Sequence, residues 1–248
     1  MKPATQGSIG YDASRFAAIA AVEERHFWFR SRSRLIVWAL RRHFPRARSM
    51  LEIGCGTGNV LAALQQSGME RLVGAEAHAE GLAFAARRAP GAELMQMDAR
   101  RIPFRGEFDV LGAFDVIEHV DDDEQVLREM FAACRPGGGV MLTVPQHAWL
   151  WSRRDEIAQH RRRYSRRELL AKLAAAGFQR PWATSFVSLL LPLMALSRRR
   201  KDVSSAELEV GAAANQVLGA VMALERGVIR AGVTLPAGGS LLAVAHKP

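Results

Sequence analysis

Cysteine is scarce in this sequence, and long apolar runs are missing. Only Cys55 and Cys134 occur among 248 residues, too few for a disulfide framework or a thiolate metal cluster, so no metal centre is expected. No stretch reaches the roughly 20 apolar residues that a membrane-spanning helix needs, and the amino terminus lacks the residue order of a signal peptide. These absences predict a globular protein in a reducing, cytoplasmic setting.

Positive charge exceeds negative charge in the chain. The formal net charge is +9, and the excess of arginine is concentrated in residues 23–48, 151–167 and 198–201. A basic surface attracts nucleic acids, anionic lipid headgroups or phosphorylated small molecules, and charge alone does not choose among them. Motifs and their spacing must therefore decide the class of ligand.

Short apolar runs alternate with segments of helical periodicity along most of the chain. Strands are expected at residues 50–53, 71–77, 92–97, 108–114, 140–144, near 178 and at 240–245, and helices at 60–66, 81–88, 123–134, 165–176 and 206–231. Such alternation predicts an α/β fold, a doubly wound Rossmann-like sheet of seven mostly parallel strands with an antiparallel last strand. Residues 1–47 are expected to form an N-terminal arm and helical cap, residues 48–248 the main domain, and residues 146–164 an insert after the fifth strand.

Three glycines follow the first expected strand at alternate positions. Gly54, Gly56 and Gly58 let the backbone adopt conformations closed to other residues and let a ligand approach closely. A dinucleotide motif needs its third glycine three positions after the second, where this chain has Asn59, and no Gly-Lys-Ser/Thr of a P-loop follows. The turn therefore predicts a nucleotide-binding corner of another kind.

Acidic residues stand at or beside the ends of the first four expected strands. They are Glu52, Glu76, Asp98 and Asp115. Because ligands of open parallel sheets bind outside the carboxyl ends of the strands, these carboxylates are expected to face one crevice. They would repel a pyrophosphate, and they suit a ligand that carries an ammonium group, a ribose diol and an adenine amine.

Together with these acids, residues 51–58 resemble motif I of the class I S-adenosylmethionine (SAM)-dependent methyltransferases. The resemblance implies SAM as the cofactor, with Glu76 binding both ribose hydroxyls and Asp98 receiving the adenine amino group. The residues after the fourth strand are implied to line the methionine end. The implied cofactor-binding residues are Glu52, Gly54, Cys55, Gly56, Gly58, Glu76, Ala77, Asp98, Ala99, Phe114 and Asp115.

Further segments narrow the resemblance. Residues 115–120 and 135–139 are similar to the small-molecule branch that includes quinone-pathway O-methyltransferases, and the Asn/Asp-Pro-Pro-aromatic motif of many nucleic-acid methyltransferases is lacking. Residues 26–29, 149–165 and 235–242 are similar to a bacterial subgroup that resembles enzymes of lipid, quinone or glycoconjugate pathways. The implied function is O-methylation of a small or lipid-linked acceptor. A SAM-binding partner protein without turnover and an RNA methyltransferase are the alternatives, although nucleic acid is disfavoured.

Methyl transfer from a sulfonium requires mainly an acceptor positioned in line, and a hydroxyl acceptor benefits from a general base. His160 and His119 are the candidate bases, because imidazole titrates near neutral pH, and Asp155 is a candidate to orient His160. A solvated His160 in an arginine-rich loop and a pocket-lining His119 are the alternatives. The candidate substrate-binding residues are Trp28, Arg32, Trp149, Trp151 and Tyr164.

Three segments leave alternatives open. The expected helix over residues 16–43 either packs its aromatics on the core with its arginines in solvent, or forms a lid that supplies an arginine to an anionic ligand group. Residues 183–201 are either a buried strand that runs into a helix or an apolar and basic element on a membrane surface. The helix over residues 206–231 packs on this element or pairs with a second subunit in a homodimer.

Overall fold

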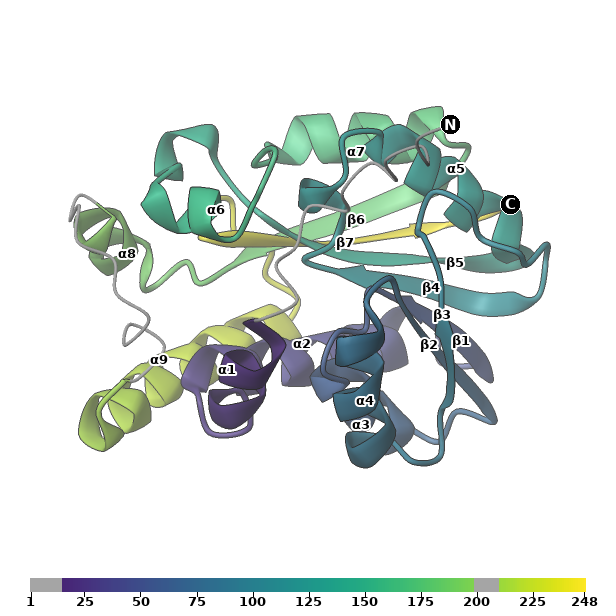
Figure 1. Ribbon diagram of the computed structural model, residues 1–248. Helices are drawn as coiled ribbons and strands as arrows, with labels where there is room; N and C mark the ends of the chain where they lie inside the picture. Colours follow the sequence, from purple (N-terminus) through teal and green to yellow (C-terminus); the bar gives the residue numbers. More distant parts are fainter. Residues whose placement is uncertain (1–14, 199–209) are drawn as a thin grey trace, which may run out of the picture.

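The computed structural model describes residues 15–198 and 210–248, which are built around one seven-stranded sheet (Figure 1). The strands are β1 (Ser49–Ile53), β2 (Arg71–Glu76), β3 (Glu93–Gln96), β4 (Phe108–Phe114), β5 (Cys134–Pro145), β6 (Gln179–Phe186) and β7 (Ser240–His246). Their order is β3-β2-β1-β4-β5-β7-β6, and β7 runs antiparallel to both neighbours whereas the other pairs are parallel. The expected fold class is confirmed, and the strand order reverses between β1 and β4, where a crevice is expected.

Helices lie on both faces of the sheet (Figure 1). One face carries α5 (Asp123–Ala133) and α7 (Arg166–Ala175), and the other carries α2 (Phe27–His43), α3 (Asn59–Gln65), α4 (Ala79–Arg88) and α9 (Ala212–Arg230). Each face has its own cluster of buried apolar side chains. All five residues of β1 are buried, because a central parallel strand is covered from both sides. The apolar runs in the sequence reflect this double burial.

The single helix expected over residues 16–43 is wrong, because the chain forms α1 (Arg15–Val22) and α2 with a break at His26. The backbone of His26 is extended, and its Nδ1 accepts a hydrogen bond from the backbone N–H of Trp28 at 3.2 Å. The His26 ring also stacks on Phe27. A side chain that caps a helix start satisfies a backbone donor there, so α2 begins after His26.

The insert after β5 is more regular than its sequence suggests. It contains the short 3-10 helix η2 (Ala148–Leu150) and α6 (Arg153–Ile157). Ser152 and Asp155 form a capping box at the start of α6, in which each side chain satisfies a backbone donor of the other residue. The insert returns to the sheet at Tyr164, which bridges to Gln146.

The described part of residues 183–201 is a strand, β6, that leads into α8 (Leu191–Ser197). The expected strand that runs into a helix is confirmed as far as residue 198, with the end of β6 buried and α8 without a buried residue. Contact of the segment with a membrane surface stays a prediction. Residues 199–201 lie outside the described residues, as do 206–209 of the expected last helix. Glu225 of α9 fixes the turn between β6 and α8, since its carboxylate accepts hydrogen bonds from three successive backbone N–H groups at 2.6–2.8 Å. Within residues 15–198 and 210–248, none of the helices combines the length and apolar composition that a membrane crossing requires.

Candidate active site

A cavity of about 280 Å³ opens at the carboxyl ends of β1, β2 and β4. Its walls come from the glycine turn, the segments after β2, β3 and β4, the helices α1 and α2, and His160 of the insert. The position agrees with the crevice expected where the strand order reverses. The volume lies near the lower end of the roughly 300–1,000 Å³ typical of small-molecule sites.

The glycine turn brings bare backbone to the cavity wall. Gly54, Gly56 and Gly58 have φ values of 65°, 53° and 81°, in the left-handed region that favours glycine. A Cβ on Gly54 would lie 2.5 Å from Val116, and one on Gly58 would lie 2.7 Å from the Cα of Ala85. The first and third glycines are therefore required by packing as well as by backbone conformation.

Glu76, at the end of β2, is locked against this turn. Its Oε2 accepts a hydrogen bond from Gly56 N–H at 3.0 Å, and its Oε1 accepts from Ala77 N–H at 2.7 Å and His78 N–H at 3.1 Å. Three backbone donors thus hold the Glu76 carboxylate in one orientation at the cavity edge. A carboxylate can accept further bonds through its remaining lone pairs, which is the geometry that a ribose diol requires.

Asp98 and Glu52 occupy contrasting electrostatic environments in the same cavity. Arg100 holds Asp98, with nitrogen–oxygen distances of 2.6 to 3.1 Å, and this hydrogen bonding lowers the pKa of Asp98 despite partial burial. Glu52 is buried, and burial raises its pKa to about 8 although Arg32 attracts the charged form. Its Oε2 has no hydrogen-bond partner among the described residues, so a bound cationic group would find an acceptor there.

Arg32 of α2 is directed into the cavity. It forms an ion pair with Asp115, and its guanidinium lies 4.7 Å from the centre of the Trp28 ring, in a cation–π arrangement. Asp115 also accepts a hydrogen bond from Thr143 Oγ1 at 3.2 Å. The Nε of Arg32 is buried without a partner in the described chain. The expectation that all arginines of this segment stay in solvent is therefore wrong for Arg32, and the lid alternative is favoured.

A second contact across the glycine turn comes from α1, to which the sequence motifs assign no role. Glu23, just after α1, is buried and accepts hydrogen bonds from Thr57 of the turn and from Arg88 of α4. Phe16 of α1 lies 3.7 Å from where a Cβ of Gly56 would stand. The sequence signal is the acidic pair Glu23 and Glu24 at the start of an arginine-rich segment.

Two histidines that line the cavity meet each other. The rings of His119 and His160 are 4.8 Å apart and nearly perpendicular. His160 Nδ1 lies 2.9 Å from Asp155 Oδ1, and Asp155 is held by Arg163 and Arg198 at 2.7 and 2.8 Å. Burial raises the pKa of Asp155, but these hydrogen bonds and positive charges outweigh it, so the pKa is well below its ordinary value. Asp155 is therefore ionised and can hold the proton of His160 Nδ1.

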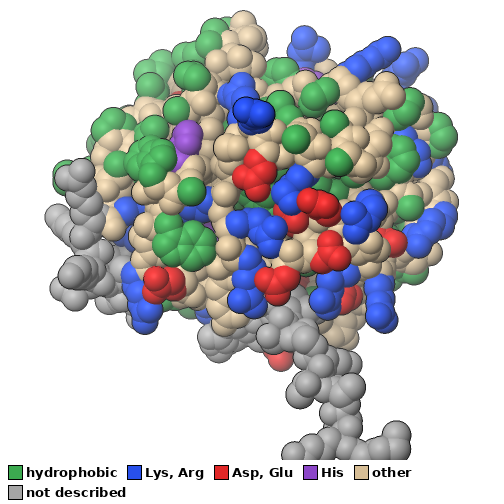
Figure 2. All heavy atoms as spheres, turned by 90° about the horizontal axis from the view of Figure 1, so that it is seen from above, with side chains coloured by type: hydrophobic (Ala, Val, Ile, Leu, Met, Phe, Trp, Pro, Cys, Tyr) green, Lys and Arg blue, Asp and Glu red, His purple; other side chains and the backbone are tan. Residues whose placement is uncertain are grey.

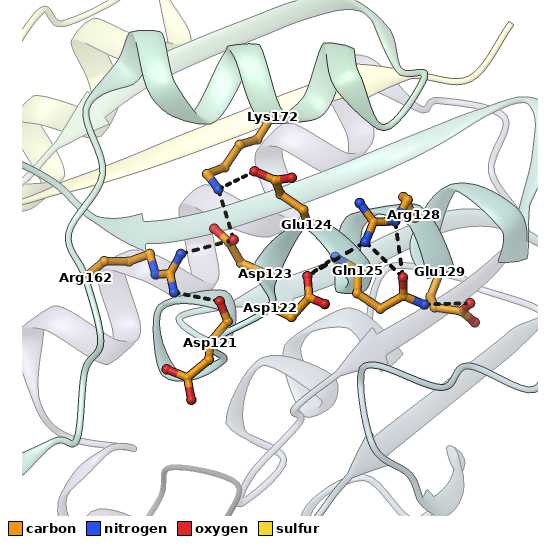
Figure 3. Close-up of polar contacts among 9 residues, drawn as sticks. All are labelled: Asp121, Asp122, Asp123, Glu124, Gln125, Arg128, Glu129, Arg162 and Lys172. Atoms are coloured by element: carbon orange, nitrogen blue, oxygen red, sulfur yellow. Dashed lines mark hydrogen bonds and ion pairs between the residues drawn. The ribbon is translucent and has the colours of Figure 1, made fainter. Parts of the chain in front are cut away.

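The end of the insert is tied to the start of α5 by a polar network (Figure 3). Asp123 accepts hydrogen bonds from Arg162 at 3.1 Å, Lys172 at 3.0 Å and the Tyr164 hydroxyl at 2.7 Å. Arg162 also donates to the backbone oxygen of Asp121 at 2.8 Å. Because several long side chains share one carboxylate, the segment that carries His160 has few alternative positions.

Residues 19–180, more than half of the chain, match the model of a family described as a methyltransferase domain. The chain belongs to this family. The match confirms the resemblance drawn from the glycine turn and the strand-end acids.

Relatives of this methyltransferase-family protein cover it only in part. A probable S-adenosylmethionine-dependent methyltransferase of Mycolicibacterium smegmatis is 29% identical over 164 residues, 65% of this chain and 63% of that protein. The phosphatidylethanolamine N-methyltransferase of Cereibacter sphaeroides is 36% identical over 104 residues, 39% of this chain and 50% of that protein. The matches thus span less than two thirds of either relative.

A solved structure extends the likeness in fold to nearly the whole chain. The phosphoethanolamine N-methyltransferase 2 of Haemonchus contortus, in complex with S-adenosyl-L-methionine, matches with a TM-score of 0.66 and 18% identity. The match covers 99% of this chain and 61% of that one. At this identity the likeness concerns the fold of the methyltransferase-family protein alone.

The structure does not bring all of the predicted substrate-binding residues into the cavity of this methyltransferase-family protein. Trp28 and Arg32 line it. Trp149 and Trp151, 63% and 40% exposed, are not among its lining residues, and Tyr164 is fully buried in the core. The prediction is wrong for Tyr164, because its buried hydroxyl is bound to Asp123. Substrate binding by Trp149 and Trp151 stays a prediction, since both side chains are exposed outside this cavity.

Glu76→Ala is expected to weaken SAM binding by about 1–3 kcal/mol, because hydrogen bonds to a charged acceptor are lost. Isothermal titration calorimetry of the two proteins measures the change. Glu80→Ala is the control, since Glu80 is exposed four residues further along and should leave the affinity unchanged. Equal affinity in the Glu76 variant would remove the ribose assignment.

Glu52 is expected to make the free protein less stable as pH rises. Between about pH 4.5, the ordinary pKa, and about pH 8, the folded state holds a proton that the unfolded chain has released, so raising the pH through this window removes stability. Each unit of pKa difference corresponds to about 1.4 kcal/mol. Urea unfolding at the two ends of the window should show a smaller loss in Glu52→Gln than in the parent. The exposed control Glu70→Gln should keep the full loss, and parallel behaviour of the two variants would contradict the prediction.

Proposed function

We propose that this protein is a SAM-dependent methyltransferase, most simply an O-methyltransferase that acts on a small or lipid-linked acceptor. The observation that carries the proposal is the carboxylate of Glu76, held by three backbone donors beside left-handed glycines at the cavity wall. This arrangement offers close backbone approach together with an oriented acceptor for a diol. Membership of the methyltransferase domain family supports the same activity.

The polar groups of the cavity fit the parts of SAM. We assign Asp98 and Ala99 to the adenine amine and Glu76 to the ribose, and all three residues line the cavity. Glu52 Oε2 and Arg32 Nε, which have no partner among the described residues, would complement an ammonium and a carboxylate, the two charges of the methionine moiety. SAM would supply a methyl group on a positively charged sulfur, which a neutral nucleophile can attack.

The two histidines that line the cavity, His119 and His160, are the groups proposed to remove the proton from the acceptor. With Asp155 as the acceptor for Nδ1–H, the Nε2 of His160 is the nitrogen left to take a proton. His119 lies against it and is the alternative base. Both residues line the same cavity as the glycine turn, so the acceptor oxygen would stand between imidazole and methyl donor, where orientation supplies much of the rate.

An apolar surface beside the insert supports a lipid-linked acceptor and contact with the inner face of a membrane. Leu193 and Leu196 of α8 are 54% and 62% exposed, and Trp149 of the insert is similarly exposed. Arg198, at the end of α8, joins the two elements by donating to Leu150 O and to Asp155. Exposed apolar side chains on neighbouring elements are typical of surfaces that bind membranes or partners.

Arg198 itself does not belong to that surface. Its guanidinium is largely buried on Asp155, and burial lowers its pKa to about 10. The hypothesis that this residue binds headgroups is therefore wrong, because the ion pair with a buried carboxylate occupies it. Residues 199–201 of the same basic run lie outside the described residues.

Leu193→Glu with Leu196→Glu is expected to reduce co-sedimentation with anionic phospholipid vesicles several-fold, because charges cannot enter the apolar boundary without a large desolvation cost. The control is Val217→Glu with Leu224→Glu, which places the same two charges at similarly exposed apolar residues of α9. Equal sedimentation of all three proteins would contradict membrane contact through α8.

The distribution of charge gives little support to an RNA substrate. On the face shown in Figure 2, basic and acidic side chains are interspersed. Several basic side chains of the described residues are paired with acids, including Lys172 with Asp123 and Glu124, and Arg161 with Asp121. A nucleic-acid site usually presents a basic stripe. Salt-sensitive RNA binding at low ionic strength would restore this alternative.

Incubation with methyl-labelled SAM and a lipid extract tests the proposed activity. The expected result is a labelled product that partitions with lipids or small aromatic compounds and that is missing with the Glu76→Ala variant. If SAM binds by calorimetry and no extract is labelled, the protein is a SAM-binding subunit without turnover instead.

A further inference from the structure

Glu118, His119 and His160 bring three metal-binding groups together beside the cavity, which the two histidines line. Their ligand atoms all lie within 4.8 Å of one another. We propose that these three side chains bind a divalent transition-metal ion on the acceptor side of the cavity. The binding of the ion stands on this geometry alone, whereas its role in catalysis rests on the proposed methyl transfer.

The donor set is selective for a class of ion. Two imidazoles and one carboxylate favour a first-row divalent cation such as Zn²⁺, Co²⁺ or Fe²⁺ over Mg²⁺ or Ca²⁺, which prefer oxygen ligands throughout. Three protein ligands leave at least one coordination position open, as in catalytic rather than structural sites. His119 and His160 also line the cavity, so an open position would be available to an acceptor.

The burial of Glu118 is a second observation that indicates a bound cation. Its side chain is fully buried, and neither carboxylate oxygen has a hydrogen-bond partner within the described part of the chain. A buried carboxylate without hydrogen bonds is costly unless a positive charge compensates it. Arg32 and Arg163 lie close enough to attract it, but each is bonded elsewhere, to Asp115 and to Asp155. A bound cation would satisfy the carboxylate directly.

His160 already has the orientation of a metal ligand. Ligating histidines usually give their other ring N–H to a carboxylate, which fixes the tautomer and makes the ligand nitrogen more basic. Asp155 Oδ1 lies 2.9 Å from His160 Nδ1, so Nε2 is the nitrogen with a free lone pair. Asp155 is in turn held by two arginines and by Ser152, and this second layer keeps the imidazole in place.

The two segments that carry the ligands are joined before any ion binds. Arg161 N–H donates to the backbone oxygen of Glu118 at 2.7 Å, directly beside His119 in one segment and His160 in the other. The Tyr164 hydroxyl donates to the backbone oxygen of Ile117 at 3.3 Å. The donors are therefore held by backbone contacts rather than by a loose loop, as a preorganised site requires.

An ion at this site would change how the acceptor is deprotonated. Coordination of the acceptor hydroxyl lowers its pKa, so that its proton leaves to solvent. The oxygen then forms a bond to the methyl carbon while the carbon–sulfur bond breaks, and the cofactor sulfur keeps the electron pair as a neutral thioether. With the ion bound, His160 is a ligand, and it serves as the base only in the ion-free protein.

Titration of the full-length, untagged protein with Co²⁺ tests the site. Visible absorption reports coordination by nitrogen and oxygen donors, and calorimetry gives the stoichiometry. We expect one Co²⁺ per chain, with affinity reduced at least tenfold in His119→Ala, His160→Ala and Glu118→Gln, since each loses a ligand. His147→Asn is the matched control, because it removes an imidazole of the same insert that does not line the cavity, and asparagine tolerates the positive φ of that position.

The outcomes separate this site from the proposed function. The site is overturned if the parent binds no Co²⁺ in the ligand-field spectrum, or if His147→Asn loses as much affinity as the three ligand variants. Thermal unfolding with and without Co²⁺ shows whether each variant is folded. A folded variant that lacks only the site keeps the melting temperature of the ion-free parent. Its melting temperature no longer rises when Co²⁺ is added. Stoichiometric Co²⁺ binding without labelled product in any extract would leave the site standing and remove the methyl transfer.

Discussion

Asp155→Ala is expected to destabilise the protein by about 3–5 kcal/mol, the cost of leaving buried charges without their partner. The carboxylate and the guanidinium of Arg163 are each only 1% exposed, and Arg198 and His160 use the same carboxylate. Without this carboxylate, the guanidinium groups of Arg163 and Arg198 are left buried without their partner. The helix α6 also loses its capping box. Urea unfolding, followed by far-ultraviolet circular dichroism, measures the loss.

The neighbouring Glu156→Ala is the matched control for that experiment. Glu156 pairs with Arg153 on the surface, and exposed ion pairs contribute only about 0–1 kcal/mol. The depressed pKa of Asp155 means that its contribution is present at neutral pH and is lost only as pH falls through the folded-state pKa, well below the ordinary value. If Asp155→Ala and Glu156→Ala unfold at the same urea concentration, the buried cluster does not hold the insert.

His160→Ala is expected to lower the rate of methyl transfer by about 10²–10⁴-fold, the usual contribution of a positioned acid or base. SAM affinity should be unchanged, because the proposed role of this imidazole is toward the acceptor, and SAM is assigned to Glu76 and Asp98. Single-turnover transfer of labelled methyl from bound SAM measures the chemical step. His147→Asn, on the same insert but outside the cavity lining, should keep the parental rate.

Added imidazole sharpens this second prediction. If His160 is a base, imidazole in solution should restore part of the rate of the alanine variant. If His160 is a metal ligand, the rate should instead fall on addition of a chelator. A variant with the parental single-turnover rate would exclude His160 from both roles.

The sequence alone predicts the sheet well, and the physical reason is local. Buried parallel strands must be apolar on both faces, so β1, β2 and β4 appear in the sequence as short apolar runs. The glycine turn can also be predicted from adjacent residues. Its left-handed backbone, and the close approach of Val116 and Ala85, allow hardly any residue other than glycine. Acidic residues at strand ends then meet at one edge simply because parallel strands end there.

Other features depend on contacts between segments far apart in the chain. The break at His26 arises from a side-chain cap that helical periodicity cannot reveal. The role of Arg32 depends on Asp115, 83 residues away, and the buried position of Arg198 depends on Asp155. Trp149 and Tyr164 are aromatic residues of the same insert, yet only the fold sends one to solvent and the other to the core.

The residues proposed to bind the cofactor were therefore positioned by features of the local sequence, and those proposed to face the acceptor by the tertiary structure. Backbone conformation and strand ends are dictated by residues adjacent in the chain, and these place Glu76, Asp98 and the glycine turn. His119 and His160 come together only because the insert folds back on the segment after β4. There Arg161 N–H bonds to Glu118 O and Asp155 bonds to His160. Such contacts form only when burial and ion pairing outweigh the entropy of closing a long loop, and residue order by itself does not reveal that balance.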